Sequence, residues 1–311
     1  YPEGISANRW RLVSVPGIID SNEIKPNDLE DGHVFYDWDP LEETWFKPDS
    51  IVIGRAYWFK HKYDEPVIFG NKDTTGYSVP LEPYEVKLHQ GANMVGSPFP
   101  FPVRADLSEG VSDPYKYGSD LKEGWADTNI FEPWAGYAVQ STSDSGKITF
   151  YPIQDTTIAA RTANTGWKLN LDLSSNSSFD RTSSIGRCDA CEENVDVNDM
   201  LLLPSLTQRV FISLDIINDG QFDYSKDLRS TSEFNGVWNM RINRPNVEGS
   251  LTLKGDYEND RPNDLVLMIV NVSTREVIKN FPNQRLELSN MNSEFNDFKI
   301  VAGEEAYVIS M

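Results

Sequence analysis

Cysteine, histidine and long apolar runs are scarce in this chain, and each shortage argues against a class of protein. The three histidines, His33, His61 and His89, show no His-x-x-x-His or HExxH spacing, which argues against a metalloprotease site. The apolar stretch from Leu265 to Val270 has the length of a buried strand, far below the roughly 18–20 residues that cross a bilayer. We therefore expect no membrane insertion.

Catalytic residues cannot be assigned from the sequence. Ser97 lies in Gly96-Ser97-Pro98, which lacks the G-x-S-x-G pattern of a nucleophile elbow. A glycosidase carboxylate pair stays open as an alternative, because the 48 acidic residues offer many pairs and spacing selects none of them. The prediction is that the protein is not an enzyme.

Basic residues are outnumbered by acidic ones. The chain has 28 Lys and Arg against 48 Asp and Glu, which gives a net charge of −20. Such a field repels nucleic acids and anionic membranes, so neither is an expected partner. The acidity fits a salty or calcium-containing exterior, where cations screen self-repulsion, and it equally fits simple solubility.

The two cysteines, Cys188 and Cys191, form a single CxxC pair. One such pair is half of a four-ligand zinc site, and the sequence has no second pair to complete it. We favour a local disulfide, which would place the chain in an oxidising compartment. Free thiols, and metal or redox chemistry, are the alternatives.

Helical periodicity is nearly absent, and strand signals dominate. Arg11–Val15, Ser50–Ile53, Tyr57–Lys60 and Lys147–Phe150 are short, rich in β-branched or aromatic residues, and bounded by turn formers. Turn signals such as Asn218-Asp219-Gly220 recur along the chain. This pattern predicts an all-β protein of several β-sandwich domains.

The first half of the chain contains an internal repeat. The segment Asn8–Pro16 is echoed by Gly91–Pro98, and Gly54–Phe59 is echoed by Trp134–Val139. The two echoes are shifted by 82 and 80 positions, and a matched offset predicts a tandem of two β-rich units.

Three domains are predicted. A tandem-repeat β domain covers residues 1–155, with units at about 1–80 and 81–155. A middle β-sandwich domain follows at 156–240, and an immunoglobulin-like sandwich is expected at 241–311. The last assignment rests on about six or seven short strands in roughly 70 residues, which is the spacing of that fold.

Three motifs carry a family resemblance: Trp10–Pro16, Gly91–Pro102 and Glu132–Tyr137. They follow the patterns W-x-hydrophobic-S-x-P, G-x-N-hydrophobic-hydrophobic-G-x-P-F and P-W-x-G-Y. In this they resemble the β-repeat and immunoglobulin-like region at the C-terminus of large secreted or cell-surface bacterial proteins, some with a type IX secretion signal. The chain departs from the family at Pro204, where a pair of prolines is usual. The resemblance implies an extracellular, non-catalytic region and no specific ligand.

Calcium is the sharpest chemical hypothesis. Five oxygen donors of the kind that calcium prefers fall within 13 residues: Asp215, Asn218, Asp219, Asp223 and Asp227. Their spacing fails the EF-hand rule, because the third ligand position would be Ile217. The alternative interpretation is a hairpin tip with solvated acids.

Two tryptophans stand apart from the apolar strand patterns. Trp38 and Trp45 are flanked by acidic residues, whereas most other tryptophans have apolar neighbours. Exposed aromatic rings beside carboxylates can form a ligand face for a sugar or a protein. The alternative is packing within a hairpin.

Together these observations predict an extracellular or cell-surface structural and interaction module, forming a subunit or region of a larger assembly. Its expected partners are other protein subunits or copies of itself. A carbohydrate-binding accessory module that recognises a polysaccharide, and a calcium-dependent adhesive protein, are the alternatives. Calcium is the one cofactor that the sequence suggests. The start, Tyr1–Gly4, lacks the basic and apolar regions of a signal peptide, so we expect a processed protein or a fragment.

Overall fold

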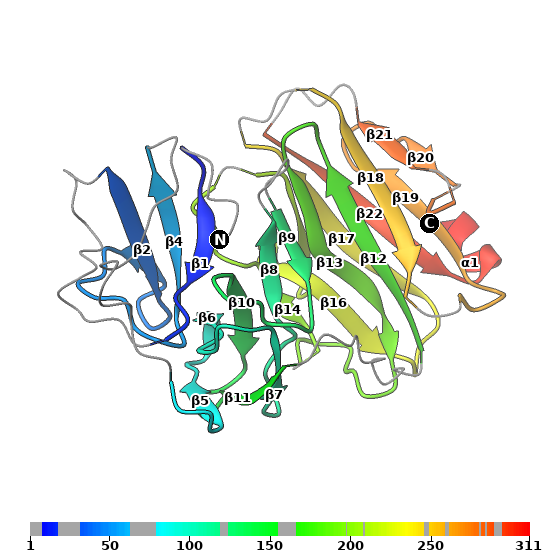
Figure 1. Cartoon of the computed structure of the whole chain (residues 1–311). Coiled ribbons are helices and arrows are strands. Elements are labelled where there is room, and N and C mark those ends of the chain that lie inside the picture. Colours follow the sequence, from blue (N-terminus) through cyan, green and yellow to red (C-terminus); the bar gives the residue numbers. More distant parts are fainter. Residues whose placement is uncertain are drawn as a thin grey trace. The chain divides into compact units, whose positions relative to one another are not determined.

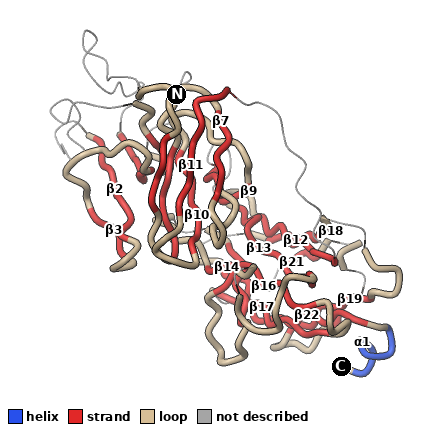
Figure 2. The backbone as a smooth tube through the Cα atoms, turned by 90° about the horizontal axis from the view of Figure 1, so that it is seen from below, coloured by secondary structure: helices blue, strands red, loops and turns tan. Residues whose placement is uncertain are grey.

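The computed structural model confirms the all-β prediction (Figure 1). It describes residues 8–17, 32–62, 79–118, 124–154, 166–196, 198–207, 209–245, 249–258, 261–279, 281–283, 285–288 and 294–311. Within these ranges the chain forms 22 strands and one helix, α1 (Glu305–Ser310), drawn in blue in Figure 2. No described helix is long and apolar enough to cross a membrane.

The chain divides into two compact units. The first comprises Tyr1–Ser119 and Asp127–Ala160, and the second comprises Asp120–Ala126 and Arg161–Met311. The short segment of the second unit carries most of strand β9 (Gly124–Asp127). The predicted domain boundary after residue 155 lies outside the described residues.

The first unit begins with a four-stranded sheet in the order β1-β4-β2-β3. Its strands are β1 (Arg11–Ser14), β2 (His33–Asp39), β3 (Thr44–Phe46) and β4 (Ala56–His61). Strand β4 occupies the centre and is almost wholly buried, which its run of aromatic residues explains. Strands β2 and β3 form a hairpin at the edge of the sheet.

Two further groups of strands complete the first unit. In one, β10 lies between β6 and β8, and in the other, β11 lies between β5 and β7. The strands are β5 (Tyr84–Lys87), β6 (Gly91–Gly96), β7 (Val103–Leu107), β8 (Tyr115–Gly118), β10 (Gly136–Ser141) and β11 (Lys147–Gln154). Their core includes Phe99, Phe131, Tyr137 and Phe150.

The strand groups β1-β4-β2 and β6-β10-β8 have the same order, with the last strand of each group along the chain at its centre. Isolated bridges also join one group to the other at equivalent positions. Val13 forms an isolated antiparallel bridge with Ala135, and Arg55 forms one with Val95. Val95 follows Val13 by 82 positions, and Ala135 follows Arg55 by 80, which are the offsets of the sequence echoes.

Two glycines let these strand groups approach closely. A Cβ added at Gly136 would lie 2.6 Å from Cγ of Leu12 and 2.7 Å from Cβ of Ala56. One added at Gly96 would overlap the Ser14 side chain. Glycine is required at both positions because any side chain would push β1 away from β6 and β10.

The second unit is built on one eleven-stranded sheet. Its main order is β20 (Val277–Ile278), β19 (Val266–Asn271), β22 (Phe295–Gly303), β17 (Gly236–Asn243), β15 (Phe211–Asp215), β16 (Tyr224–Ser230), β13 (Phe179–Cys188), β12 (Gly166–Ser174), β18 (Leu251–Tyr257) and β21 (Leu286–Leu288). Strand β14 (Met200–Leu201) pairs with β16 beside this order. Strands β13 and β16 pair in parallel.

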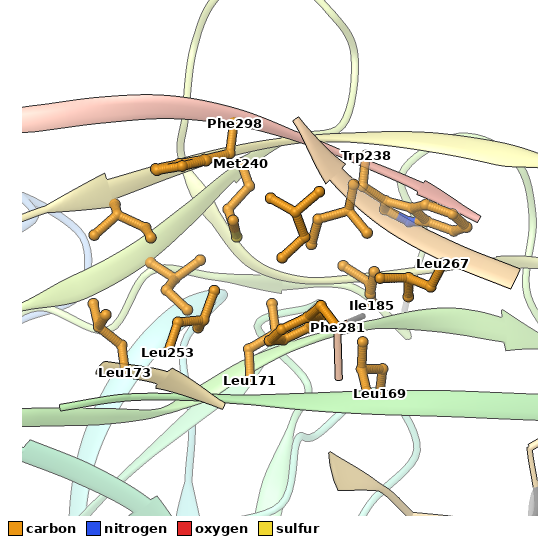
Figure 3. Close-up of a cluster of buried hydrophobic side chains, with 14 of the residues drawn as sticks. Leu169, Leu171, Leu173, Ile185, Trp238, Met240, Leu253, Leu267, Phe281 and Phe298 are labelled. Atoms are coloured by element: carbon orange, nitrogen blue, oxygen red, sulfur yellow. The ribbon is translucent and has the colours of Figure 1, made fainter. Parts of the chain in front are cut away.

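The core of the second unit follows from the alternation of apolar and polar residues in its strands. In β12, Trp167, Leu169, Leu171 and Leu173 are buried, and the residues between them are more exposed. Strand β17 alternates in the same way, with Trp238, Met240 and Ile242 inward. Figure 3 shows the leucines of β12 on one side of this core, opposite Trp238, Met240 and Phe298.

The structure differs from the predicted division at residue 240. Strand β17 runs through that position and pairs with β15 on one side and β22 on the other. Its inward residues belong to a single core with those of β12 and β19, so 156–240 and 241–311 do not separate at this point. The polar residues Asn239 and Arg241 occupy the less buried positions of this strand.

Candidate functional site

The hairpin of β2 and β3 places the two predicted ligand-face tryptophans side by side. Trp38 and Trp45 are cross-strand partners, with ring centroids 4.7 Å apart and ring planes inclined by 57°. Trp38 is only 8% exposed, and its indole Nε1 donates a hydrogen bond of 2.9 Å to the carbonyl oxygen of Ala92. The pair therefore packs within the first unit and does not offer two coplanar exposed rings.

A groove of about 310 Å³ opens beside this hairpin. Its wall is formed by Trp38–Leu41, Phe46, Arg55, Val86–His89 and Asn93–Val95. Two of these segments come from strands at sheet edges, because Phe46 ends β3 and Val86 and Lys87 end β5. The groove is thus lined by apolar and charged residues, some of which belong to the two edge strands.

Arg55 is held in the groove wall by a buried carboxylate. Its Nη2 lies 3.3 Å from Oδ1 of Asp37 and donates a hydrogen bond of 3.1 Å to the carbonyl oxygen of Trp38. The Asp37 side chain is 4% exposed, whereas that of Arg55 is 39% exposed. Within the described part of the chain, Nε and Nη1 of Arg55 have no protein partner. Asp37 and the carbonyl oxygen of Trp38 therefore fix the orientation of the guanidinium, and its Nε and Nη1 can donate to a ligand.

The electrostatics of Asp37 are set by its burial. Burial raises the pKa of Asp37 from 3.8 to about 6, and this outweighs the opposing effects of the Arg55 charge and the Trp38 N–H. That N–H donates to Oδ1 over 2.8 Å. The carboxylate is thus ionised at neutral pH at a cost to stability.

This cost predicts that the stability of the wild type depends on pH and that Asp37→Asn abolishes this dependence. Between pH 3.8 and about 6, the folded protein keeps a proton on Asp37 that the unfolded chain has released. The free energy of unfolding therefore falls as pH rises through this window, and it stays lower above it. Asparagine removes this fall, so D37N is expected to be more stable than the wild type at pH 7, by up to about 3 kcal/mol.

Urea unfolding at several pH values checks this prediction. The control is Glu82→Gln, which neutralises an exposed carboxylate and should leave the wild-type pH profile unchanged. A D37N profile that still falls between pH 4 and 6 as steeply as the wild type would show that Asp37 is not the group responsible.

Four other polar side chains complete the wall of the groove, those of Asn93, His89, Lys87 and Asp39. Asn93 accepts a hydrogen bond from the His89 backbone N–H (3.0 Å) and donates one to its carbonyl oxygen (2.8 Å), which fixes the turn after β5. His89 and Lys87 are exposed, and His89 Nδ1 lies 3.7 Å from a carboxylate oxygen of Asp144. The carboxylate of Asp39 accepts backbone N–H groups of the hairpin turn. The wall therefore carries two cationic side chains, Arg55 and Lys87, on a chain of negative net charge.

The residues proposed to bind calcium lie in the second unit, where they form hydrogen bonds and ion pairs with neighbouring protein groups. Asp215 accepts hydrogen bonds from the backbone N–H groups of Asp219 (3.2 Å) and Gly220 (3.0 Å), so it stabilises the loop after β15. Asp227 receives Nε and Nη2 of Arg229 at 3.1 and 2.8 Å.

The remaining candidates also have local contacts. The Asn239 side-chain amide donates to Oδ1 of Asn218 over 2.6 Å, and Oδ1 of Asp219 accepts the Gln221 N–H over 2.9 Å. The backbone carbonyl of Asp223 accepts the Leu202 N–H over 2.8 Å. Burial raises the pKa of Asp227, which disfavours the ionised form that a cation requires. Over the described residues, no group of three or more His, Cys, Asp or Glu side chains is placed to hold a metal ion.

Cys188 and Cys191 are joined by a disulfide, the pairing that the sequence favoured. Their Cα atoms are 5.2 Å apart, and both residues are buried against Leu228. The bond closes the turn that follows β13, far along the chain from the groove residues.

Sequence reasoning missed Arg55, Lys87, His89 and Asn93. One signal could have found Arg55, because the repeat aligns it with Ala135. One copy of the repeat has arginine at this position and the other has alanine, so the strand arrangement that both copies share does not require the charge.

Comparisons with known proteins add no identification. No protein-family model matches this chain, and neither a curated protein nor a solved structure does.

Proposed function

We propose that this chain is an extracellular, non-catalytic interaction module of a cell-surface assembly, and that the groove of its first unit receives a protein partner. The observation that carries the proposal is the Arg55–Asp37 pair, which holds a guanidinium on the groove wall with donors left for a ligand. Side chains held in one geometry before binding lose little entropy when a partner arrives.

Three features support the extracellular and structural part of the proposal. The Cys188–Cys191 disulfide fits an oxidising compartment. The matched bridges Val13–Ala135 and Arg55–Val95 support an origin of the first unit from two copies of one β unit. Repetition of this kind builds surface area, and the resemblance to secreted bacterial regions points the same way.

The test compares the chain with two lysine variants in cells of its source. Lys87→Glu reverses a charge on the groove wall, and it is expected to be tolerated because Lys147 lies opposite Lys87 across β5 and β11. The matched control is Lys254→Glu, another exposed strand lysine, in β18 of the second unit. Protease treatment of intact cells and native electrophoresis report location and assembly.

The expected result is cleavage of the chain on intact cells and a native mass well above its 35.2 kDa. K87E should lower that mass towards the single chain, and K254E should not. Cleavage only after lysis, or a wild-type native mass equal to one chain, would contradict the proposal.

A further inference from the structure

We infer that the groove binds an extended peptide segment of a partner protein in which acidic and apolar residues alternate, and that Arg55 receives one of its carboxylates. This inference rests on the proposed function and names its ligand class. It follows from three features of the groove: the charge of its wall, the apolar side chains exposed there and the position of two edge strands.

Charge complementarity identifies an anionic ligand. The wall presents the cations Arg55 and Lys87, and Oδ1 of its one acidic residue, Asp39, already accepts the N–H groups of Leu41 and Glu42. A guanidinium with free donors matches a carboxylate in shape as well as in charge. Lys87 adds longer-range attraction at the rim, where salt screens it.

The apolar part of the wall favours a peptide over a sugar. Trp38 offers no face for stacking on a sugar ring, because it is buried and its indole N–H is bonded to Ala92, so Phe46 is the one exposed phenylalanine, tyrosine or tryptophan ring among the described residues of the wall. The exposed apolar groups are Leu41 and Phe46, which is 39% exposed at the end of β3. Isolated side chains of this kind suit the apolar side chains of a peptide.

The edge strands supply the recognition of backbone. Strands β3 and β5 stand at the ends of their sheets, and among the described residues each pairs with one neighbouring strand. An extended peptide adds to such an edge through main-chain hydrogen bonds, and its side chains then alternate between the two faces. Acidic residues on one face and apolar residues on the other would meet the cations and Phe46 respectively.

Binding of labelled probes to the purified full chain tests the inference by fluorescence anisotropy. The probes are a short peptide of alternating glutamate and valine, the same peptide with lysine for glutamate, and an oligogalacturonate. The glutamate peptide should bind at least about tenfold tighter than either of the others, and more weakly as salt rises.

Two groove variants and one control locate the site. Arg55→Lys keeps a charge beside Asp37 but loses the planar fork, and it should weaken binding of the glutamate peptide about tenfold. Lys87→Glu, which leaves the Arg55–Asp37 pair intact, should weaken it by about the same factor and flatten the salt dependence. Lys254→Glu should bind like the wild type.

Each contrary outcome overturns the inference in a distinct way. Tighter binding of the oligogalacturonate assigns the groove to a polysaccharide. If the glutamate peptide fails to bind while K87E still disrupts the native assembly, the ligand class is wrong and the proposed function stands. If K87E changes neither measurement, the groove has no role and both proposals fail.

Discussion

Replacing Trp238 with alanine is expected to destabilise the second unit by about 3–5 kcal/mol. The side chain is fully buried near the start of β17, and its ring centroid lies 5.7 Å from that of Trp167 in an edge-to-face arrangement. The guanidinium carbons of Arg229 and Arg187 lie 4.8 and 5.7 Å from the Trp238 ring centroid. Alanine would leave a cavity and deprive both arginines of the ring against which they rest.

Urea unfolding of the full chain measures this effect, with Val277→Ala as the control. Val277 lies in β20 of the same unit and is largely exposed, so its truncation should change the free energy of unfolding by less than about 0.5 kcal/mol. A loss below about 1 kcal/mol in W238A would mean that β17 does not anchor this core.

Replacing Asp180 with alanine is expected to have a comparable cost, for an electrostatic reason. The carboxylate is wholly buried and accepts hydrogen bonds from Thr182 N–H and Oγ1, from Ser183 Oγ and from Ile212 N–H, at 2.7–3.3 Å. Arg209 Nη1, itself 4% exposed, lies 3.6 Å from Oδ1. Alanine would remove the carboxylate and leave these donors and the charge of Arg209 without their buried partner, which typically costs about 3–5 kcal/mol.

The control for this variant is Asp264→Ala, since Asp264 is an exposed acid of the same unit. It should unfold at the wild-type urea concentration, whereas D180A should unfold much earlier. Equal midpoints for D180A and the wild type would show that Asp180 does not organise β13 and β15.

Local sequence patterns predicted much of the fold. The alternation in β12, where Trp167, Leu169 and Leu171 point inward, follows from the two-residue period of a strand. The offset of the two sequence echoes also corresponds to the spacing of the bridges made by Val13 and Arg55. Such features lie within one segment or are repeated at a fixed distance, so the sequence carries them directly.

The groove could not be predicted in this way. The indole N–H of Trp38, a residue of the groove wall, donates a hydrogen bond to the carbonyl oxygen of Ala92, which is 54 positions away in the sequence. The proximity of these two residues depends on how the sheets of the first unit pack. The acidic surroundings of Trp38 suggested exposure, but Asp37 is turned inward to Arg55. Likewise, the spacing of the acids near Asp215 did not reveal that the carboxylate of Asp215 accepts two backbone N–H groups of its own loop.

Photo-crosslinking from Phe46 in source cells tests the central claim most directly, which is that the groove holds a segment of a partner protein. Benzoylphenylalanine is placed at position 46 or, as a control, at position 277 in the second unit. The account predicts a discrete adduct from position 46 whose crosslinked residue lies in an extended acidic segment of another protein. It also predicts loss of that adduct in the K87E background and none from position 277. The account is contradicted if position 46 yields no adduct, or if both positions capture the same proteins.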